Sequence, residues 1–316
     1  MARIAEDNDF DNLKQLVDDN DGWILELDKS ETKVYTRPVE GCSFQMVKIT
    51  TFFEDISAEI LYDVLHDPDY RKVWDTHMLE SLEIGVFNVN NDIGYYAMQC
   101  PAPLRPRDFV LQRSWLDTGC EQMLISRSVE HKDYPPKKGY VRAFTHITGF
   151  LLRSKPPSGC ILNYVAQCDP QGKLPPWLVN KVTHTLGPRM IKDLRKAALG
   201  YVQWKYSQSH FRKPWRYPED ITVPRILIED CWEPAKIQQG QLDIAEASKI
   251  NIAQSNSLKE IETTTKNTKV HSNGDKNVNF NTKSNSTNNS PVLEKKKTSK
   301  RKFKFKFDKF TRDRSE

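Results

Sequence analysis

Residues 174–205 read LPPWLVNKVTHTLGPRMIKDLRKAALGYVQWK and form the longest helical pattern in the chain. Two prolines open the pattern, where a helix tolerates them best. Apolar side chains then recur every three or four residues, at Val179, Val182, Leu186, Met190, Leu194, Ala197 and Tyr201. Pro188 cannot donate a hydrogen bond to the carbonyl of His184, so we expect a kink at Gly187-Pro188. A late helix of this kind typically covers a sheet.

Strand patterns dominate the sequence before this helix. They lie at 23–27, 33–37, 44–53, 80–88, 94–99, 108–115, 122–129, 140–152 and 160–168. Helical patterns lie at 9–17, at 58–66 with Ser57 as the N-cap, and at 67–75. The links between strands are too short for crossover helices, which predicts an antiparallel sheet. The order of these elements predicts an α+β domain.

Some strands place polar and apolar side chains on the same face. Asp108, Val110, Gln112 and Ser114 share one such face. Two interpretations stay open at this point. The sheet either has one core face and one wet face, or it curves around a ligand cavity with a mixed lining.

The composition divides the chain into four parts. Residues 235–292 are rich in Asn, Ser, Thr and Lys and hold a single aromatic residue, Phe280, so they cannot offset the entropy of ordering. We therefore expect an N-terminal extension at 1–8, a folded domain at 9–220, a disordered linker at 221–293 and a basic-aromatic tail at 294–316. The domain is long enough to bury a sizeable core.

Charge and cysteine usage exclude some classes of function. The net charge is +5, and residues 294–316 alone carry eight Lys and three Arg against four acids, or +7, which leaves −2 for the rest. A domain without a basic surplus is not expected to bind nucleic acid. The six cysteines are scattered without a CxxC pair, which indicates a reducing, cytoplasmic compartment. The sequence shows neither a signal peptide nor a membrane-spanning run.

The chain carries no recognisable catalytic motif. It lacks a GxSxG elbow, a phosphate-binding loop, an HExxH helix and metal-ligand spacing among its seven histidines, so we expect no enzyme activity and no cofactor. Arg71 and Asp75 are four residues apart on a predicted helix and can pair. They form either a surface ion pair beside a packed Trp74 or a guanidinium held toward a cavity, ready to bind phosphate.

Five separated motifs resemble the START family of lipid-transfer domains. They are LHDPDYRKVWD at 65–75, GYYAMQCPAPLRPRDFV at 94–110, YPPKKGYVRA at 134–143, DPQGKLPPWLVN at 169–180 and KPWRYPED at 213–220. In detail they are similar to the subgroup that contains the phosphatidylcholine transfer proteins. The resemblance implies a helix-grip fold, in which a curved antiparallel sheet surrounds a lipid tunnel and a long C-terminal helix closes it. It also implies a carrier that moves a phospholipid between membranes without chemistry, and we expect the protein to be a monomer.

The resemblance assigns roles to particular residues. Arg71 and Asp75 match the positions that bind the lipid phosphate. The headgroup cage would comprise Tyr96, Met98, Phe109 and His146, with Thr148 nearby. Only two of these are aromatic, whereas a quaternary ammonium is best held by several aromatic faces. We therefore expect both phosphatidylcholine and phosphatidylethanolamine to be accepted.

The same resemblance makes the long helix a lid over the tunnel. Its face toward the acyl chains would comprise Val179, Val182, Leu186, Met190 and Leu194, and Trp177 and Leu178 would touch the membrane. Gly187-Pro188 then becomes either a hinge for opening or a static kink.

The tail alternates cations with phenylalanines, as Lys-Phe-Lys-Phe-Lys-Phe at 302–307. It is either a solvated segment, a nuclear-import signal at 295–302, or a tether in which Phe303, Phe305 and Phe307 insert into an anionic membrane surface. Phosphorylation at Thr298 or Ser299 would weaken such a tether. The alternative function for the whole protein is a lipid-sensing interaction module that binds lipid without exchanging it.

Overall fold

The structure is a computed structural model that describes residues 2–29, 31–40, 44–102, 104–172, 187–209 and 211–234. The helices are α1 (Asp7–Asp18), α2 (Ala58–His66), α3 (Pro68–Trp74) and α5 (Gly187–Ser207). The strands of the first half are β1 (Ile24–Lys29), β2 (Thr32–Arg37), β3 (Met46–Phe53), β4 (Met78–Asn88), β5 (Asn91–Met98) and β6 (Arg107–Asp117). The remaining strands are β7 (Glu121–Ser128), β8 (Glu130–His131), β9 (Val141–Arg142), β10 (Phe144–Lys155), β11 (Gly159–Asp169) and β12 (Cys231–Trp232).

One large sheet organises these elements. Its order is β1-β2-β3-β11-β10-β7-β6-β5-β4, and every pair along this path is antiparallel. The short β9 adds to β6 in parallel, and β12 pairs with β8 in a separate two-stranded sheet. The large sheet is not closed, because β1 and β4 remain its edges. The α+β class and the antiparallel sheet predicted from the sequence are confirmed.

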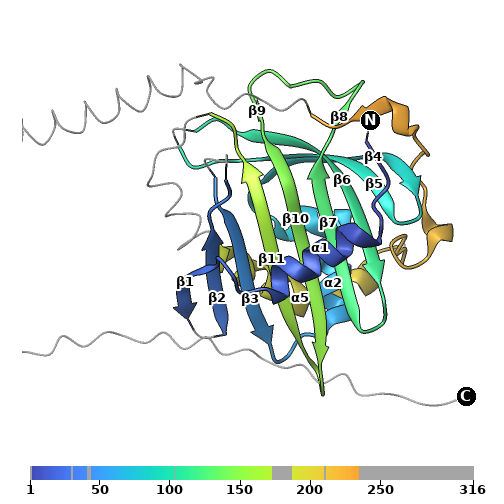
Figure 1. Cartoon of the computed structure of the whole chain (residues 1–316). Helices are drawn as coiled ribbons and strands as arrows, with labels where there is room; N and C mark the ends of the chain where they lie inside the picture. Colours follow the sequence, from blue (N-terminus) through green and yellow to red (C-terminus); the bar gives the residue numbers. More distant parts are fainter. Residues whose placement is uncertain are drawn as a thin grey trace, which may run out of the picture. The chain divides into compact units, whose positions relative to one another are not determined.

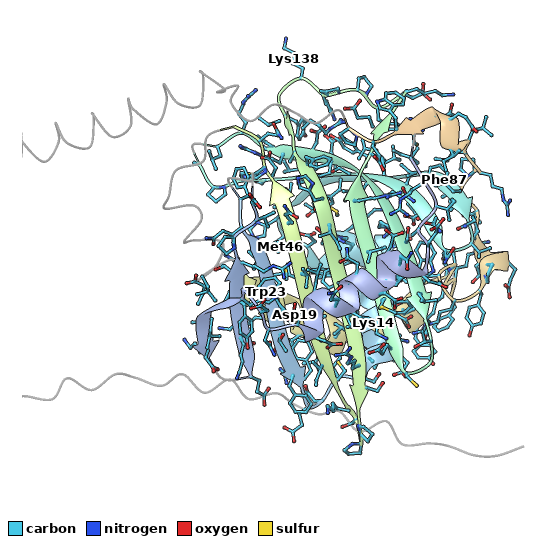
Figure 2. All side chains as sticks on the ribbon, in the orientation of Figure 1. Lys14, Asp19, Trp23, Met46, Phe87 and Lys138 are labelled. Carbon is cyan, nitrogen blue, oxygen red and sulfur yellow. The ribbon has the colours of Figure 1, made fainter. Side chains whose placement is uncertain are left out.

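Helix α1 crosses one face of the sheet, in front of the strands in Figure 1. Its buried residues Phe10, Leu13, Leu16 and Val17 follow the helical period and pack with Met46. Figure 2 labels Trp23 and Met46 beside this helix. Gly149 makes the close approach possible, since a Cβ atom there would lie 2.4 Å from a methyl group of Leu13.

Helices α2, α3 and α5 cover the opposite face. Ser57 caps α2 as expected, because its hydroxyl accepts a hydrogen bond from the backbone N–H of Ile60 at 3.3 Å. Leu61 and Val64 of α2 and Leu194 of α5 are almost completely buried in the largest core cluster. The apolar stripe of α5 therefore packs onto α2, as the helical period in the sequence indicates.

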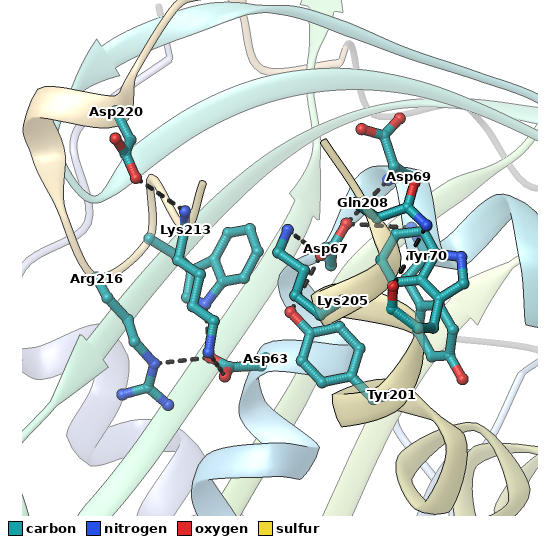
Figure 3. Close-up of polar contacts among 12 residues, drawn as sticks. Asp63, Asp67, Asp69, Tyr70, Tyr201, Lys205, Gln208, Lys213, Arg216 and Asp220 are labelled. Atoms are coloured by element: carbon teal, nitrogen blue, oxygen red, sulfur yellow. Dashed lines mark hydrogen bonds and ion pairs between the residues drawn. The ribbon is translucent and has the colours of Figure 1, made fainter. Parts of the chain in front are cut away.

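Two buried carboxylates fasten α5 and the segment after it to the other helices (Figure 3). The carboxylate of Asp63 accepts hydrogen bonds from Lys213 Nζ at 2.6 Å, Trp215 Nε1 at 2.8 Å and Arg216 Nε at 2.6 Å. Asp67 also lies within this cluster.

The carboxylate of Asp67 accepts from Lys205 Nζ at 2.8 Å and Tyr201 Oη at 3.1 Å, and it also caps α3. Both aspartates are at most 4% exposed. We call this cluster the α5 anchor; its members are Asp63, Asp67, Tyr201, Lys205, Lys213, Trp215 and Arg216.

The long helix is described from Gly187 to Ser207, as helix α5, and it ends two residues past its predicted end. The predicted kink at Gly187-Pro188 lies at the border of the described residues and stays a prediction. The predicted helical residues 174–186 lie outside the described residues, and so do the predicted positions Trp177, Leu178, Val179, Val182 and Leu186.

The predicted strand 140–152 is divided in the structure. Residue Ala143 separates β9 from β10, and its backbone N–H donates to Asp108 O at 2.9 Å. The other strand and helix bounds lie within three residues of their predicted positions.

The folded domain extends past both predicted boundaries. Residues 221–234, expected to belong to a linker, return along the sheet edge. There the backbone N–H of Ile226 donates to Val86 O at 3.0 Å, the N–H of Val86 donates to Pro224 O at 2.9 Å, and Cys231 is completely buried. Gly85 leaves the room for this segment, because a Cβ atom there would lie 2.6 Å from Ile226. At the other end, Ala2 is buried and its N–H donates to Cys231 O at 3.0 Å. The predicted tail and most of the predicted linker lie outside the described residues.

Candidate functional site

A cavity of about 370 Å³ lies between the sheet and the helices α2, α3 and α5. This volume falls within the usual range for sites that bind small molecules. Much of its wall is apolar, with contributions from Leu65, Trp74, Leu82, Ile93, Leu111, Leu124, Phe150, Tyr164, Met190 and Leu194. The two described members of the predicted acyl-chain face, Met190 and Leu194, are in this set.

Arg71 and Asp75 meet at one wall of this cavity. Helix α3 starts at Pro68 with Asp67 as its N-cap, and its last turn brings Arg71 Nε within 3.2 Å of Asp75 Oδ2. Asp75 also accepts hydrogen bonds from Tyr96 Oη at 2.9 Å and from the backbone N–H of His77 at 3.2 Å. The carboxylate is therefore held on three sides and fixes the direction of the arginine.

Most of the Arg71 guanidinium remains available. Its Nε donates to Asp75, and the Tyr96 hydroxyl lies close to the guanidinium. Neither Nη atom makes a hydrogen bond of 3.5 Å or less with a described residue. The guanidinium carbon lies 5.0 Å from the Tyr96 ring centre and 5.7 Å from that of Trp74. A guanidinium with two free Nη groups at a cavity wall can bind a phosphate through two parallel hydrogen bonds. We call Arg71, Asp75 and Tyr96 the Arg71 site.

Four of the five predicted headgroup residues line the same cavity: Tyr96, Met98, Phe109 and Thr148. Tyr96 and Phe109 are opposite each other in the β5–β6 ladder, and their ring centres lie 6.4 Å apart. Trp74, Phe150 and Tyr164 add further aromatic surface to the described wall, and Trp74 lies beside Arg71.

His146 is not among the described residues that line this cavity, and its predicted place in the headgroup cage stays a prediction. The register of β10 against β11 shifts between Thr145 and Ile147, which adds a residue at this point. As a result Thr145 and Thr148 both line the cavity, with their Oγ1 atoms 3.0 Å apart. His146 is exposed and lines a separate hollow of about 570 Å³ beside α1.

The sequence analysis also missed several polar residues of the cavity wall. Glu83, Arg113 and Asp193 line it from β4, β6 and α5. The alternation of β6 could have indicated Arg113, because it shares a face with Phe109. The mixed face singled out instead carries Gln112 and Ser114, which line the hollow beside α1.

The described wall offers binding groups rather than catalytic ones. Burial raises the pKa of Cys168 to about 12, so this thiol stays protonated at neutral pH. Burial also raises the pKa of Tyr164. In the described part of the chain no group of three or more His, Cys, Asp or Glu residues could hold a metal ion. None of the helices described is long and apolar enough to cross a membrane.

Sequence comparison relates this chain to proteins of known kinds. A model of the START domain matches residues 3–205. START domain-containing protein 10 of Mus musculus is 39% identical over 231 residues, which cover 72% of this chain and 79% of that protein. The protein of the same name from Homo sapiens is 38% identical over 230 residues, with the same coverage. Phosphatidylcholine transfer protein of Mus musculus is 25% identical over 186 residues, which cover 57% and 85% of the two chains.

Solved structures show the same fold. The crystal structure of human STARD10 matches with a TM-score of 0.71 and 36% identity, and the match covers 75% of this chain and 97% of that one. Human StAR-related lipid transfer protein 5 matches with a TM-score of 0.56 and 22% identity over 61% of this chain and 94% of that one.

Proposed function

The chain belongs to the START domain family, and we propose that it binds one phospholipid in the cavity and carries it between membranes. Among its relatives are proteins named for lipid transfer, which supports binding and transfer of a lipid rather than catalysis. The observation that carries the phospholipid proposal is Arg71, whose two free Nη groups face a largely apolar cavity. A phosphate would satisfy the guanidinium while acyl chains cover the apolar wall.

We propose further that both phosphatidylcholine and phosphatidylethanolamine are carried. Tyr96 and Phe109 provide aromatic faces for a quaternary ammonium, each worth roughly 0.5–2 kcal/mol when water is excluded. Thr145 and Thr148 provide hydroxyl acceptors for a primary ammonium on the same wall. A site with both kinds of group would discriminate weakly between the two headgroups.

The test has two steps. Native mass spectrometry of the purified full chain identifies the lipids that it retains, and we expect both phospholipids. Transfer from labelled donor vesicles to unlabelled acceptor vesicles then separates a carrier from a lipid sensor, because a sensor binds lipid without exchanging it. Retention of a sterol alone would contradict the proposal.

We also propose that residues 294–316 tether the protein to anionic membranes. These residues lie outside the described part, and the proposal rests on their net charge of +7 and their alternating phenylalanines. Deleting them should reduce co-sedimentation with phosphatidylserine vesicles. Replacing Phe303, Phe305 and Phe307 by serine keeps the charge and measures the contribution of insertion. Unchanged sedimentation of the deletion variant would refute the tether.

A further inference from the structure

Three carboxylates among the described residues line the cavity, and they differ in their partners. Asp75 pairs with Arg71, and Asp193 lies 3.7 Å from Arg189 on the same helix. Glu83 has no hydrogen bond and no cation within ion-pair distance among the residues that the structure describes. An unpaired carboxylate is therefore part of the wall of a cavity in which the other charges are paired.

The strand register explains why Glu83 reaches the cavity. Ser81, Leu82 and Glu83 of β4 all line the cavity, and Ser81 and Glu83 lie on the same face of the strand. Glu83 pairs with Gly94 of β5, which has no side chain to cover it. By surface area Glu83 is exposed, yet burial raises its pKa. The two observations agree if the exposed surface of Glu83 is cavity wall.

The charges around Glu83 favour a cation. Arg113 lies nearby, but its guanidinium is held side-on by Asp92, with Nε–Oδ1 and Nη2–Oδ2 distances of 2.8 and 2.5 Å. Arg113 is thus hydrogen-bonded to Asp92 and also interacts with Glu83. One positive and two negative charges leave this end of the cavity with a net charge of about −1. A lipid that fills the cavity would displace water from Glu83, which is costly for a carboxylate without a bonded partner, and a cation from the same ligand would offset that cost.

Glu83 and Arg71 are placed to bind opposite charges of one headgroup. Ser81 is opposite Tyr96, the residue whose ring contacts Arg71, and Glu83 is two residues further along the same strand. Two residues of a strand span about 7 Å. A zwitterion with its phosphate at Arg71 can therefore direct its positive end toward Glu83.

We propose that Glu83 accepts a hydrogen bond from the primary ammonium of an aminophospholipid whose phosphate is bound by Arg71. The proposal rests on the phospholipid function above and adds the residue that distinguishes ethanolamine from choline. Both headgroups are attracted to the charge of Glu83, but the quaternary ammonium has no N–H group to donate. Glu83 thus favours the primary ammonium, whereas Tyr96 and Phe109 favour choline.

The variant Glu83→Gln keeps the shape and removes the charge. Glu80→Gln is the matched control, because Glu80 lies on the same strand but pairs with Lys137 and Tyr140 outside the cavity. Each full-length protein is incubated with vesicles of equal phosphatidylcholine and phosphatidylethanolamine content, and the bound lipids are counted by native mass spectrometry. We expect the ethanolamine-to-choline ratio to fall roughly tenfold in Glu83→Gln, as for the loss of one charge-assisted hydrogen bond, and to stay unchanged in Glu80→Gln.

A second measurement needs no variant. Wild-type protein is offered phosphatidylethanolamine with zero, one, two or three N-methyl groups, and the sharpest fall in uptake should come at the third, which removes the last N–H. The role of Glu83 would be overturned if the Glu83→Gln protein folds but keeps the wild-type ratio of bound lipids. It would also be overturned if the third methyl group does not change uptake by the wild type. Neither result would contradict the phospholipid function. A wild-type protein that takes up neither phospholipid would refute the phospholipid function itself.

Discussion

The α5 anchor and the Arg71 site lie on consecutive helices but differ in how completely their polar atoms are bonded. In the anchor, the buried carboxylate of Asp63 accepts hydrogen bonds from three side chains. In the Arg71 site, the guanidinium donates to the carboxylate of Asp75, and the Arg71 side chain is one-third exposed. The two sites are eight residues apart in the sequence, counted from Asp63 to Arg71.

This difference separates a structural cluster from a binding site. A buried carboxylate that already accepts several hydrogen bonds cannot bind a ligand as well, and its removal leaves the partner charges unpaired. A guanidinium with free donors at a cavity wall has little structural role and can meet a ligand at small cost. The helices α2 and α3 thus fasten α5 on one side and present Arg71 on the other.

The largest effect on stability is expected from Asp63→Ala. This change removes a buried carboxylate that pairs with the partly buried Lys213 and Arg216, and breaking a buried ion pair costs about 3–5 kcal/mol. Urea denaturation followed by circular dichroism should show this loss in the free energy of unfolding. The control is Asp69→Ala, which removes an exposed partner of Lys72 and should cost less than about 1 kcal/mol. Equal losses in the two variants would contradict the anchor.

Arg71→Gln tests the Arg71 site, where we expect an effect on lipid transfer rather than on stability. We expect the transfer rate to fall roughly tenfold to hundredfold, because hydrogen bonds to charged groups contribute about 1.5–3 kcal/mol each. The free energy of unfolding should change by less than about 1 kcal/mol, since the ion pair is partly exposed. The neighbouring exposed Lys72, replaced by glutamine, is the control and should transfer normally. A large loss of stability in Arg71→Gln would show that the two regions are not distinct.

Local patterns predicted much of the fold and one part of the site. The Ser57 cap, the apolar face of α1 and the pairing of Arg71 with Asp75 depend on residues at most eight positions apart, so the sequence alone indicates them. These features are set by the helix period and by side-chain chemistry.

Long-range contacts could not be predicted in this way. Asp63 meets Trp215, 152 residues later, and only the folded sheet brings them together. The place of His146 depends on a bulge that shifts the alternation of β10 by one residue, and no turn residue marks it. The burial of Cys231 depends on an edge that Gly85 leaves open.

A smaller effect should appear when the pH is lowered. His66 is buried against Tyr62, Trp115 and the anchor residue Trp215, and burial holds its pKa well below 6.5. The folded protein keeps this imidazole neutral, whereas the unfolded chain takes up a proton as the pH falls below 6.5, so stability is full above that pH and declines below it. The slope from this residue is about 1.4 kcal/mol per pH unit.

The replacement His66→Phe keeps an aromatic ring and removes the titration. Unfolding free energies at pH 7.5, 6.5 and 5.5 should therefore fall less steeply for the variant than for the wild type. Parallel pH profiles for the two proteins would show that His66 does not carry the effect.

The smallest effect on transfer is expected from Tyr96→Phe, which tests the hydrogen bond between Tyr96 and Asp75 in the Arg71 site. The variant removes the hydroxyl that donates to Asp75 at 2.9 Å but keeps the ring beside the guanidinium. Asp75 retains Arg71 and the N–H of His77, so the free energy of unfolding should fall by about 0.5–1.5 kcal/mol. Transfer should fall less than in Arg71→Gln, because the free Nη groups remain, and Tyr96→Leu, which also removes the ring, should lie between the two. If Tyr96→Phe lowered transfer as much as Arg71→Gln, lipid binding would depend on the Tyr96 hydroxyl and its hydrogen bond to Asp75 rather than on the guanidinium.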